Sequence, residues 1–433
     1  MAKDSRRIPV EEQCEVLSLI GDVAEDRDGP SLNVHVVLGL SDGTTRDGHL
    51  IEGRVFPTLE VVVTENPAEL RKVMHPELGI ALIDLDRQAT RPTSCSRGVA
   101  CPAAGKPLRR RLGRPGAGTV MLAIRVNEFG GPDVLRVEEV DIPRPGQDEI
   151  LVRVMAAGVG PWDVSLRQGG YPGPLPYIPG GEFAGVVEGD TGSFASFYEG
   201  APVYGYPGLT GCYAQYVTCP VEQLAPIPAA LSVVDAAATP IDGLTAEQGL
   251  TDELGVGADD RLLITAGAGG LGHFAVQIAR ALGAIVVATA SPQHHEFVHK
   301  LGAAAVVDHT KPDWPERVRD VIDGGPAKVL ACAEPTLAGA ARAARDGATI
   351  ATPVHADYPD AQRVIWRSYN GKPRGSRLIR MAPWFDNGTL SVHVSSRYFW
   401  RNAARAQRKV SEGHTRGKIV LIVDEDLAAQ LEV

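Results

Sequence analysis

The sequence predicts an α/β protein whose second half forms a doubly wound parallel sheet, preceded by a strand-rich part and a small separate domain. From Arg261 onward, apolar strand-like runs alternate with helical runs, a pattern typical of a parallel sheet covered by helices on both faces. A glycine-rich turn, Thr265 to Gly272, follows the first of these strands. Between Arg87 and Val120, eight basic residues, no acidic residue and nine Gly or Pro indicate a linker.

The composition is that of a globular protein, and it limits the classes of function. Of 433 residues, 44% are hydrophobic and 22% are charged, which excludes a disordered or fibrous chain. The net charge of -10 argues against a chain dedicated to nucleic acid, and no apolar run reaches the roughly 18 residues of a membrane helix. The six cysteines are scattered, and no apolar signal core follows the charged residues 1–7. These patterns predict a cytoplasmic protein without a disulfide framework.

Residues 10–86 are predicted to form the small N-terminal domain. Short runs rich in Val, Ile and Leu predict strands at Cys14–Ile20, Ser31–Leu38 and Glu60–Thr64, and Pro67–Met74 predicts a short helix. His35 and His49 are expected near each other on adjacent strands. Ordinary sheet hydrogen bonds are favoured for this pair over a shared metal site, because the sequence offers no evident third ligand.

Residues 87–120 are predicted to be a flexible basic linker. Its segment Leu112 to Gly116 partly resembles an AT-hook, in which Arg side chains on both sides of a Gly enter the DNA minor groove. Leu112 replaces the first of those Arg residues. A flexible linker is therefore the favoured interpretation, and DNA contact the alternative.

The second half of the chain is predicted from alternating runs. After strands at Glu149–Met155, Phe183–Val187 and Tyr213–Thr218, strands and helices alternate. The sequence predicts strands at Leu262–Thr265, Ile285–Thr289, Ala305–Asp308, Val329–Cys332 and Thr349–Thr352, and helices at Gly270–Leu282 and Pro292–Leu301.

The glycine-rich turn predicts a dinucleotide-binding, Rossmann-type site. Its pattern Gly-x-Gly-x-x-Gly is weak alone, but here it follows an apolar strand and opens a helix. The glycines permit a tight turn and a close approach to a pyrophosphate, which the N–H groups and dipole of the helix N-terminus attract. The residues expected to bind the cofactor here are Thr265, Ala266, Gly267, Gly269, Gly270, Leu271 and Gly272.

The end of the next strand indicates which nicotinamide cofactor is bound. An NAD enzyme is expected to carry an acidic residue there for the ribose 2′-hydroxyl. This chain has Thr289-Ala-Ser291 instead, with no carboxylate until Glu296. Ser291, His294 and His309 are expected to bind a 2′-phosphate, so the sequence favours NADPH over NADH.

The order of short motifs from Met121 to the C-terminus resembles the medium-chain dehydrogenase/reductase superfamily, in its zinc-independent quinone oxidoreductase branch. The resemblance lies in Val126–Asp133, Ala157–Asp163, Arg167–Tyr171, Pro179–Gly185, Leu244–Ala246 and Gly413–Leu421. It implies a GroES-like catalytic domain of residues 121–245, an inserted Rossmann domain of residues 246–375 and a catalytic return segment of residues 376–433.

Zinc members of this superfamily use two Cys and a His beside a Glu, whereas here Gly181 precedes Glu182 and no cysteine cluster exists. A catalytic zinc needs three protein ligands, so no metal is expected. The implied function is NADPH-dependent hydride transfer to a quinone, enone or similar conjugated carbonyl. The resemblance also implies a small-molecule substrate and a homo-oligomer.

The resemblance assigns further site residues one by one. Tyr171 matches a cleft tyrosine that contacts or protonates the substrate carbonyl. Asp163 matches a cleft position, but a helix cap or a structural hydrogen bond is the favoured role for its carboxyl. Thr245 matches a contact to the nicotinamide end. Arg416 and Lys418 are expected to approach the cofactor phosphates from the return segment.

The N-terminal domain resembles the PPC domain (plants and prokaryotes conserved). The matching segments are Glu15–Gly21, His35–Gly39, Asp47–Gly53 and Pro57–Thr64. The resemblance implies a small α/β domain that usually forms trimers. Two other functions stay open at this point: a DNA-associated regulator that uses NADPH binding as a redox signal, and a biosynthetic enoyl reductase.

Overall fold

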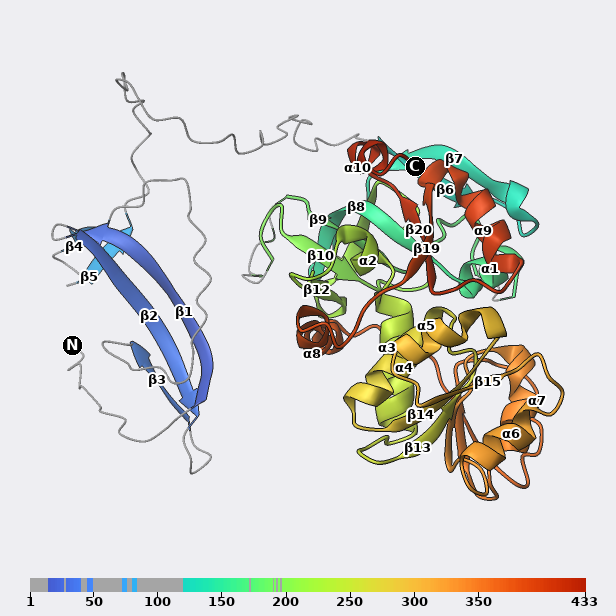
Figure 1. Cartoon of the computed structure of the whole chain (residues 1–433). Coiled ribbons are helices and arrows are strands. Elements are labelled where there is room, and N and C mark those ends of the chain that lie inside the picture. The colour runs from blue at the N-terminus through green and yellow to red at the C-terminus, as the bar shows by residue number, and fades with distance from the viewer. Residues whose placement is uncertain are drawn as a thin grey trace, which may run out of the picture. The chain divides into compact units, whose positions relative to one another are not determined.

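The computed structural model describes two units of the chain separately, residues 1–109 and residues 110–433 (Figure 1). The residues described are 15–26, 29–39, 45–49, 72–75 and 80–83 in the first unit, and 120–170, 173–189, 191, 194 and 197–433 in the second.

The first unit contains a three-stranded antiparallel sheet and a separate two-stranded one. The strands are β1 (Glu15–Asp26), β2 (Gly29–Gly39), β3 (Thr45–His49), β4 (Lys72–His75) and β5 (Ile80–Ile83). His35 and His49 are directly paired between β2 and β3, which confirms that they lie on adjacent strands. The helix predicted at Pro67–Met74 is wrong for Lys72–Met74, because these residues pair with β5 as a strand. The strand predicted at Glu60–Thr64 and the basic linker lie outside the described residues.

The strand-rich part of the second unit is built from both ends of that unit. Its strands are β6 (Val120–Val126), β7 (Leu135–Asp141), β8 (Glu149–Val159), β9 (Phe183–Val187), β10 (Pro202–Gly205), β11 (Tyr216–Pro220), β12 (Leu224–Pro226), β19 (Val394–Phe399) and β20 (Lys418–Ile422). The main sheet has the order β12-β10-β9-β8-β20-β19, with β11 also paired to β8. The C-terminal strand β20 therefore lies beside β8, as an interrupted catalytic domain requires.

The interrupting part is a six-stranded sheet whose strand pairs are all parallel. Its strands are β13 (Arg261–Ile264), β14 (Ile285–Ala290), β15 (Ala305–Asp308), β16 (Lys328–Leu330), β17 (Thr349–Thr352) and β18 (Ile365–Ser368). The order β15-β14-β13-β16-β17-β18 is the Rossmann order 3-2-1-4-5-6. The predicted fold class is thereby confirmed.

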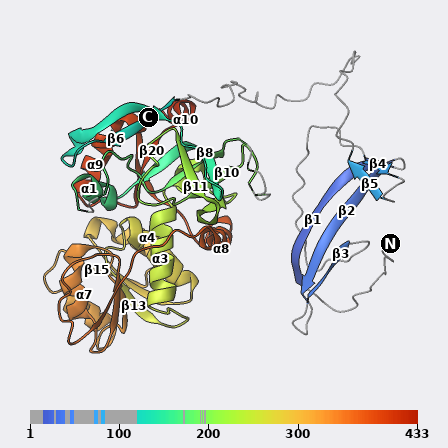
Figure 2. The ribbon, with the colours of Figure 1, turned by 180° about the vertical axis from the view of Figure 1, so that it is seen from behind.

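Helices cover both faces of the six-stranded sheet, and further helices pack against the strand-rich part (Figure 2). They are α1 (Pro161–Arg167), α2 (Val233–Ala237), α3 (Pro240–Gln248), α4 (Gly270–Ala281), α5 (His295–Lys300), α6 (Trp314–Val321), α7 (Leu337–Ala343), α8 (Gly375–Asp386), α9 (Ala403–Ser411) and α10 (Glu425–Gln430). None of the helices in the described ranges is long and apolar enough to cross a membrane.

Strand β13 shows why an uninterrupted apolar run forms the centre of this sheet. Leu262 and Ile264 belong to a core cluster with Phe274 of α4, whereas Leu263 belongs to a different cluster with Trp314 of α6. Alternate side chains of a strand point to opposite faces, so burial on both faces needs apolar residues at every position. Helices on both faces then fix the carboxyl end of β13, where the glycine-rich loop begins.

Candidate active site

The glycine-rich loop is anchored by Thr265, directly after β13. The side chain is fully buried, and its hydroxyl oxygen accepts the N–H of Cys332 at 3.0 Å. The same oxygen lies 2.7 Å from the hydroxyl oxygen of Thr336. Because Cys332 and Thr336 follow β16, Thr265 joins the carboxyl ends of two neighbouring strands. Thr265 therefore holds the start of the glycine-rich loop against the end of β16.

The loop then turns sharply into α4. Ala266 has a φ of 51°, in the left-handed region. A Cβ atom at Gly272 would lie 2.1 Å from the backbone oxygen of Ala266, so only glycine fits this close approach. Helix α4 begins at Gly270, and no side chain caps its N-terminus. The first N–H groups of α4 are consequently available to an anion such as a pyrophosphate.

The side chains predicted to bind the 2′-phosphate of the ribose lie at the carboxyl ends of β14 and β15. Ser291 is buried, and its hydroxyl oxygen lies 3.4 Å from Nε2 of His309. His294 is half-buried in the short turn after Ser291. The structure thus brings Ser291 and His309 together across two strands, with His294 on the same edge of the sheet.

Thr245 lies on α3 in a buried position. Its backbone oxygen accepts the hydroxyl of Tyr369 at 2.9 Å, and Tyr369 directly follows β18. The carboxyl end of the sixth strand is therefore tied to α3. This contact places Thr245 beside the edge of the sheet that also carries the glycine-rich loop.

Tyr171, the predicted proton donor, lies outside the described residues.

Asp163 is fully buried at the start of α1 and is used by the backbone. Its Oδ2 accepts the N–H of Gly160 at 2.8 Å, and its Oδ1 accepts the N–H of Gly180 at 3.2 Å. Burial raises the pKa of Asp163 to about 7, although the hydrogen bonds from Gly160 and Tyr213 act in the opposite direction. This carboxyl caps a helix and fixes the segment before Glu182; a role in catalysis stays a prediction.

The raised pKa of Asp163 leads to a testable pH dependence. The pKa of Asp163 is about 7 in the folded protein and 3.8 in the unfolded reference state. The carboxyl therefore contributes fully to the stability of the fold below about pH 4, and this contribution is lost as the pH rises through 7. We expect the stability of Asp163→Asn relative to the natural protein to rise by about 3 kcal/mol between pH 4.5 and pH 8. Urea unfolding of both proteins across this range measures the difference. A difference that stays constant with pH contradicts the raised pKa.

Lys418 forms a buried ionic cluster that sequence reasoning missed. Its Nζ donates to Oε1 of Glu182 at 2.8 Å and to Oδ2 of Asp242 at 2.5 Å, and only 2% of its side chain is exposed. Burial alone lowers the pKa of Lys418, but the carboxylates of Asp242 and Glu182 raise it further than burial lowers it. Burial raises the pKa of Glu182. The predicted contact of Lys418 with cofactor phosphates stays a prediction, since here its ammonium is engaged inside the protein.

The ionic cluster lies at the N-terminus of α4. A Cβ atom at Gly270 would lie 2.5 Å from Oδ2 of Asp242 and 3.3 Å from Cδ of Lys418. The backbone of the return segment is also hydrogen-bonded to the glycine-rich loop, because Gly417 donates to the oxygen of Ala268 at 2.8 Å. The return segment therefore contacts the glycine-rich loop through its backbone and through the side chain of Lys418. No local motif in the sequence marks Asp242, whose partner Lys418 is 176 residues away.

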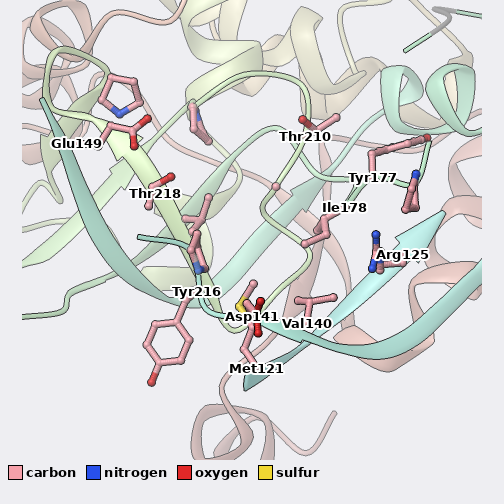
Figure 3. Close-up of a pocket in the computed structure, with 16 residues that line it drawn as sticks. Met121, Arg125, Val140, Asp141, Glu149, Tyr177, Ile178, Thr210, Tyr216 and Thr218 are labelled. Atoms are coloured by element: carbon pink, nitrogen blue, oxygen red, sulfur yellow. The ribbon is translucent and has the colours of Figure 1, made fainter. Parts of the chain in front are cut away.

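A separate cavity of about 520 Å³ lies in the strand-rich part (Figure 3). It is lined by residues of β6, β7, β8 and β11 and of three loops, among them Arg125, Asp141, Tyr177, Thr210 and Tyr216. None of the predicted site residues lines it. We therefore place the candidate active site at the glycine-rich loop and not in this cavity.

Three known families match separate segments of the chain. The Plants and Prokaryotes Conserved (PCC) domain matches residues 1–67, the alcohol dehydrogenase GroES-like domain residues 146–229, and the zinc-binding dehydrogenase family residues 270–352. A solved structure of an NAD-dependent alcohol dehydrogenase shares 31% identity and a TM-score of 0.64, over 70% of this chain and 100% of that one. The chain belongs to the medium-chain dehydrogenase/reductase superfamily.

Relatives within the superfamily differ in cofactor and acceptor. A mycobacterial member solved with NADPH shares 29% identity and a TM-score of 0.64, over 70% of this chain and 100% of that one. The quinone oxidoreductase of Mus musculus is 33% identical over 204 residues, 46% of this chain and 62% of the relative. The NADPH-dependent alkenal/one oxidoreductase of Arabidopsis thaliana is 28% identical over 314 residues, 68% of this chain and 78% of the relative. The chain thus spans less than two thirds of the mouse relative.

The residues of this superfamily member do not fit a catalytic zinc ion. At Gly181, where zinc members carry a His, a Cβ atom would lie 2.9 Å from the backbone oxygen of Gly208 and 2.8 Å from Cδ1 of Ile241. A His side chain has no room there with this backbone. Within the described ranges, no group of three His, Cys, Asp or Glu side chains is arranged to hold a metal ion.

Proposed function

We propose that this protein is a zinc-independent, NADPH-dependent oxidoreductase that transfers a hydride to a quinone, an enone or a similar conjugated carbonyl. The observation that carries the proposal is the uncapped N-terminus of α4, reached through a turn that only glycine at position 272 permits. This turn lies at the carboxyl end of the first strand of a Rossmann sheet, where dinucleotides bind.

The kind of acceptor follows from the poor fit to zinc. Reduction of a simple ketone or aldehyde needs strong polarisation of the carbonyl, which a zinc ion supplies in zinc dehydrogenases. A quinone or enone already offers an electron-poor carbon, so orientation and one polar contact to the oxygen are sufficient. The names of the mouse and Arabidopsis relatives, a quinone oxidoreductase and an alkenal/one oxidoreductase, support this class of acceptor.

Four of the predicted side chains and the glycine-rich loop receive a proposed role in this reaction. Bound NADPH supplies the hydride. The N–H groups at the head of α4 hold the pyrophosphate, and Ser291 and His309 hold the ribose phosphate. Thr245, fixed by Tyr369, contacts the nicotinamide end. Tyr171 donates a proton or hydrogen bond to the carbonyl oxygen.

The choice of NADPH rests on the end of β14. Thr289-Ala-Ser291 carries no carboxylate that would repel a 2′-phosphate. The solved relatives include both an NADPH complex and an NAD-dependent enzyme, so this segment is the basis of the choice.

A titration with both cofactors tests the function directly. We expect the full chain to bind NADPH more tightly than NADH, seen by nucleotide fluorescence, and to oxidise NADPH when a 1,4-quinone is added. Tyr171→Phe is expected to lower kcat by roughly a hundredfold with little change in the Kd for NADPH, since it removes a proton donor and no cofactor contact. Tighter binding of NADH, or activity that depends on stoichiometric zinc, would contradict the proposal.

A further inference from the structure

Three polar side chains at the carboxyl ends of β17 and β18 form a hydrogen-bonded triad. His355 lies on the loop after β17, Ser368 ends β18, and Asn370 follows two residues later. Nδ1 of His355 lies 3.0 Å from Oγ of Ser368, and Nε2 lies 2.8 Å from Oδ1 of Asn370. We call these three residues the polar triad. It joins the ends of the fifth and sixth strands of the Rossmann sheet.

The order of the three groups is that of a proton carrier. An amide oxygen only accepts hydrogen bonds, so Nε2 of His355 carries a hydrogen and donates it to Asn370. The other ring nitrogen, Nδ1, then faces a hydroxyl that both donates and accepts. Ser368 donates to Nδ1 of a neutral ring, whereas Nδ1 of a charged ring donates to Ser368 and frees its hydroxyl hydrogen for another acceptor. Both hydrogen bonds therefore persist when the imidazole gains or loses a proton.

The loop that carries His355 is held against β18 by an aromatic pair. The rings of Tyr358 and Trp366 are stacked, with their centroids 4.9 Å apart. The hydroxyl of Tyr358 donates to the backbone oxygen of Val354 at 2.8 Å, and Nε1 of Trp366 donates to that of Pro359 at 2.9 Å. These contacts fix the loop on both sides of His355, so the imidazole is held in place before any substrate binds.

The polar triad lies over the half of the sheet that receives the nicotinamide. In the strand order 3-2-1-4-5-6, the pyrophosphate lies after the first strand and the adenine half lies toward the second and third strands. The nicotinamide half therefore extends toward β16, β17 and β18. Tyr369, between two members of the triad, donates to the backbone oxygen of Thr245 at 2.9 Å. A Cβ atom at Gly371 would lie 2.1 Å from Oγ1 of Thr245, so residues 368–371 lie beside the proposed nicotinamide contact.

Resting on the proposed reductase function, we propose that the polar triad delivers the proton that completes the reduction of an enone. Ser368 gives its hydroxyl proton to the α-carbon, His355 replaces that proton, and Asn370 orients the imidazole. All three residues are exposed, so water returns a proton to His355 after each turnover. The triad thereby assigns enones, and not quinones alone, as acceptors of this protein.

The step is balanced in atoms and charge. Hydride transfer, which oxidises NADPH to NADP⁺, forms a C–H bond at the β-carbon and moves the electron pair of the C=C bond toward the carbonyl oxygen. The resulting enolate is held by Tyr171. When the carbonyl forms again, the α-carbon takes the hydroxyl proton of Ser368, whose oxygen takes the Nδ1 proton of the charged His355. A neutral imidazole with its Nε2 hydrogen remains. A quinone needs no such step, since the oxygens of its reduced form exchange protons with water directly.

Reduction of 2-methyl-2-cyclohexen-1-one by the full chain tests the proposal, because protonation of its α-carbon creates the stereocentre of the product. We expect the natural protein to give one enantiomer in clear excess, measured by chiral gas chromatography. Ser368→Ala and His355→Gln should lose this excess and lower kcat for the enone roughly tenfold or more, because the α-carbon must then take its proton from water. Their kcat for a 1,4-quinone should change by less than about twofold, because this reaction needs no proton at carbon.

Three further variants and one spectrum separate proton transfer from support of the fold. Asn370→Asp keeps an acceptor for Nε2 and should keep the enantiomeric excess, whereas Asn370→Leu should lose it. Ser411→Ala is the matched control, because the exposed Ser411 donates its hydroxyl to the backbone oxygen of Gln407 on α9 at 2.9 Å. It should change neither rate nor product. Independently of turnover, ¹⁵N NMR of the full chain without cofactor should show the Nε2–H tautomer of His355.

These outcomes separate the polar triad from the proposed reaction. A racemic product from the natural protein, an unchanged excess in Ser368→Ala, or an Nδ1–H tautomer of His355 overturns the triad and leaves the reductase function standing. Equal losses of enone and quinone turnover in Ser368→Ala also overturn it, because the triad then only supports the fold. A natural protein that reduces quinones but no enone refutes the triad alone, and one that binds no NADPH refutes both proposals.

Discussion

Lys418→Met is expected to lower the free energy of unfolding of the oxidoreductase module by about 3–5 kcal/mol at pH 7.5. The substitution leaves the carboxylates of Glu182 and Asp242 without their cation. Glu182 is fully buried, and Asp242 nearly so, which means that water cannot replace the lost ammonium. Breaking one side of a buried ionic group is costly for this reason, even where the intact group adds little net stability.

The pH dependence of this loss identifies its cause. Burial already raises the pKa of Glu182, and removal of Lys418 takes away the nearest charge that lowers it. The Glu182 carboxyl should then accept a proton more readily, and the cost of Lys418→Met should shrink as pH falls from 8 to 5. Loss of packing alone would give the same cost at every pH.

Urea unfolding followed by tryptophan fluorescence measures both effects. Lys300→Met is the matched control, because Lys300 forms an exposed pair with Glu296 on α5. It should cost less than about 0.5 kcal/mol. If Lys418→Met is as mild as Lys300→Met, the buried cluster is not the stabilising unit that its geometry indicates.

The contrast between Lys418 and the glycine-rich loop shows what can be predicted from sequence. The loop is a local feature: strand, turn and helix follow one another from Arg261 to Ala281, so spacing alone predicts the geometry. The pairing of His35 with His49 is similarly local, because it needs only two neighbouring strands. Lys418 instead finds its partners 236 and 176 residues away. Only the closure of the sheet by β20 brings these side chains together.

Asp163 and Arg416 illustrate a second limit. The sequence places Asp163 at the start of a helix, where both a capping role and a role in the cleft are possible. Only the structure shows that both carboxylate oxygens accept backbone N–H groups. Arg416 was expected to approach the cofactor phosphates. Its orientation by His393 and Phe297 depends on contacts among three segments that the sequence does not join. Sequence reasoning therefore finds such residues but misses the contacts that distant packing gives them.

Gly272→Ala is expected to abolish measurable dinucleotide binding, a loss of roughly a hundredfold or more. The new Cβ would lie 2.1 Å from the oxygen of Ala266 and 2.8 Å from the Cα of Gly267, and both are backbone atoms. No rotamer change can relieve such a contact, so the turn itself must move. Because the turn positions the N–H groups at the head of α4, the anion site is lost with it. The same strain should lower the unfolding free energy by roughly 1–3 kcal/mol.

Gly269→Ala separates the two consequences. Gly269 has a φ of -78°, which any residue adopts, and its Cβ would meet only the oxygen of Ala266 at 3.3 Å. This variant should unfold at nearly the natural urea concentration. It should nevertheless weaken NADPH and NADH alike, because a methyl group at the helix N-terminus obstructs the approach of a pyrophosphate to the backbone. Strong dinucleotide binding by a folded Gly269→Ala protein would mean that the pyrophosphate, and with it the dinucleotide, binds away from α4. Weak binding together with natural stability would show that Gly269 is needed for binding the dinucleotide and not for folding.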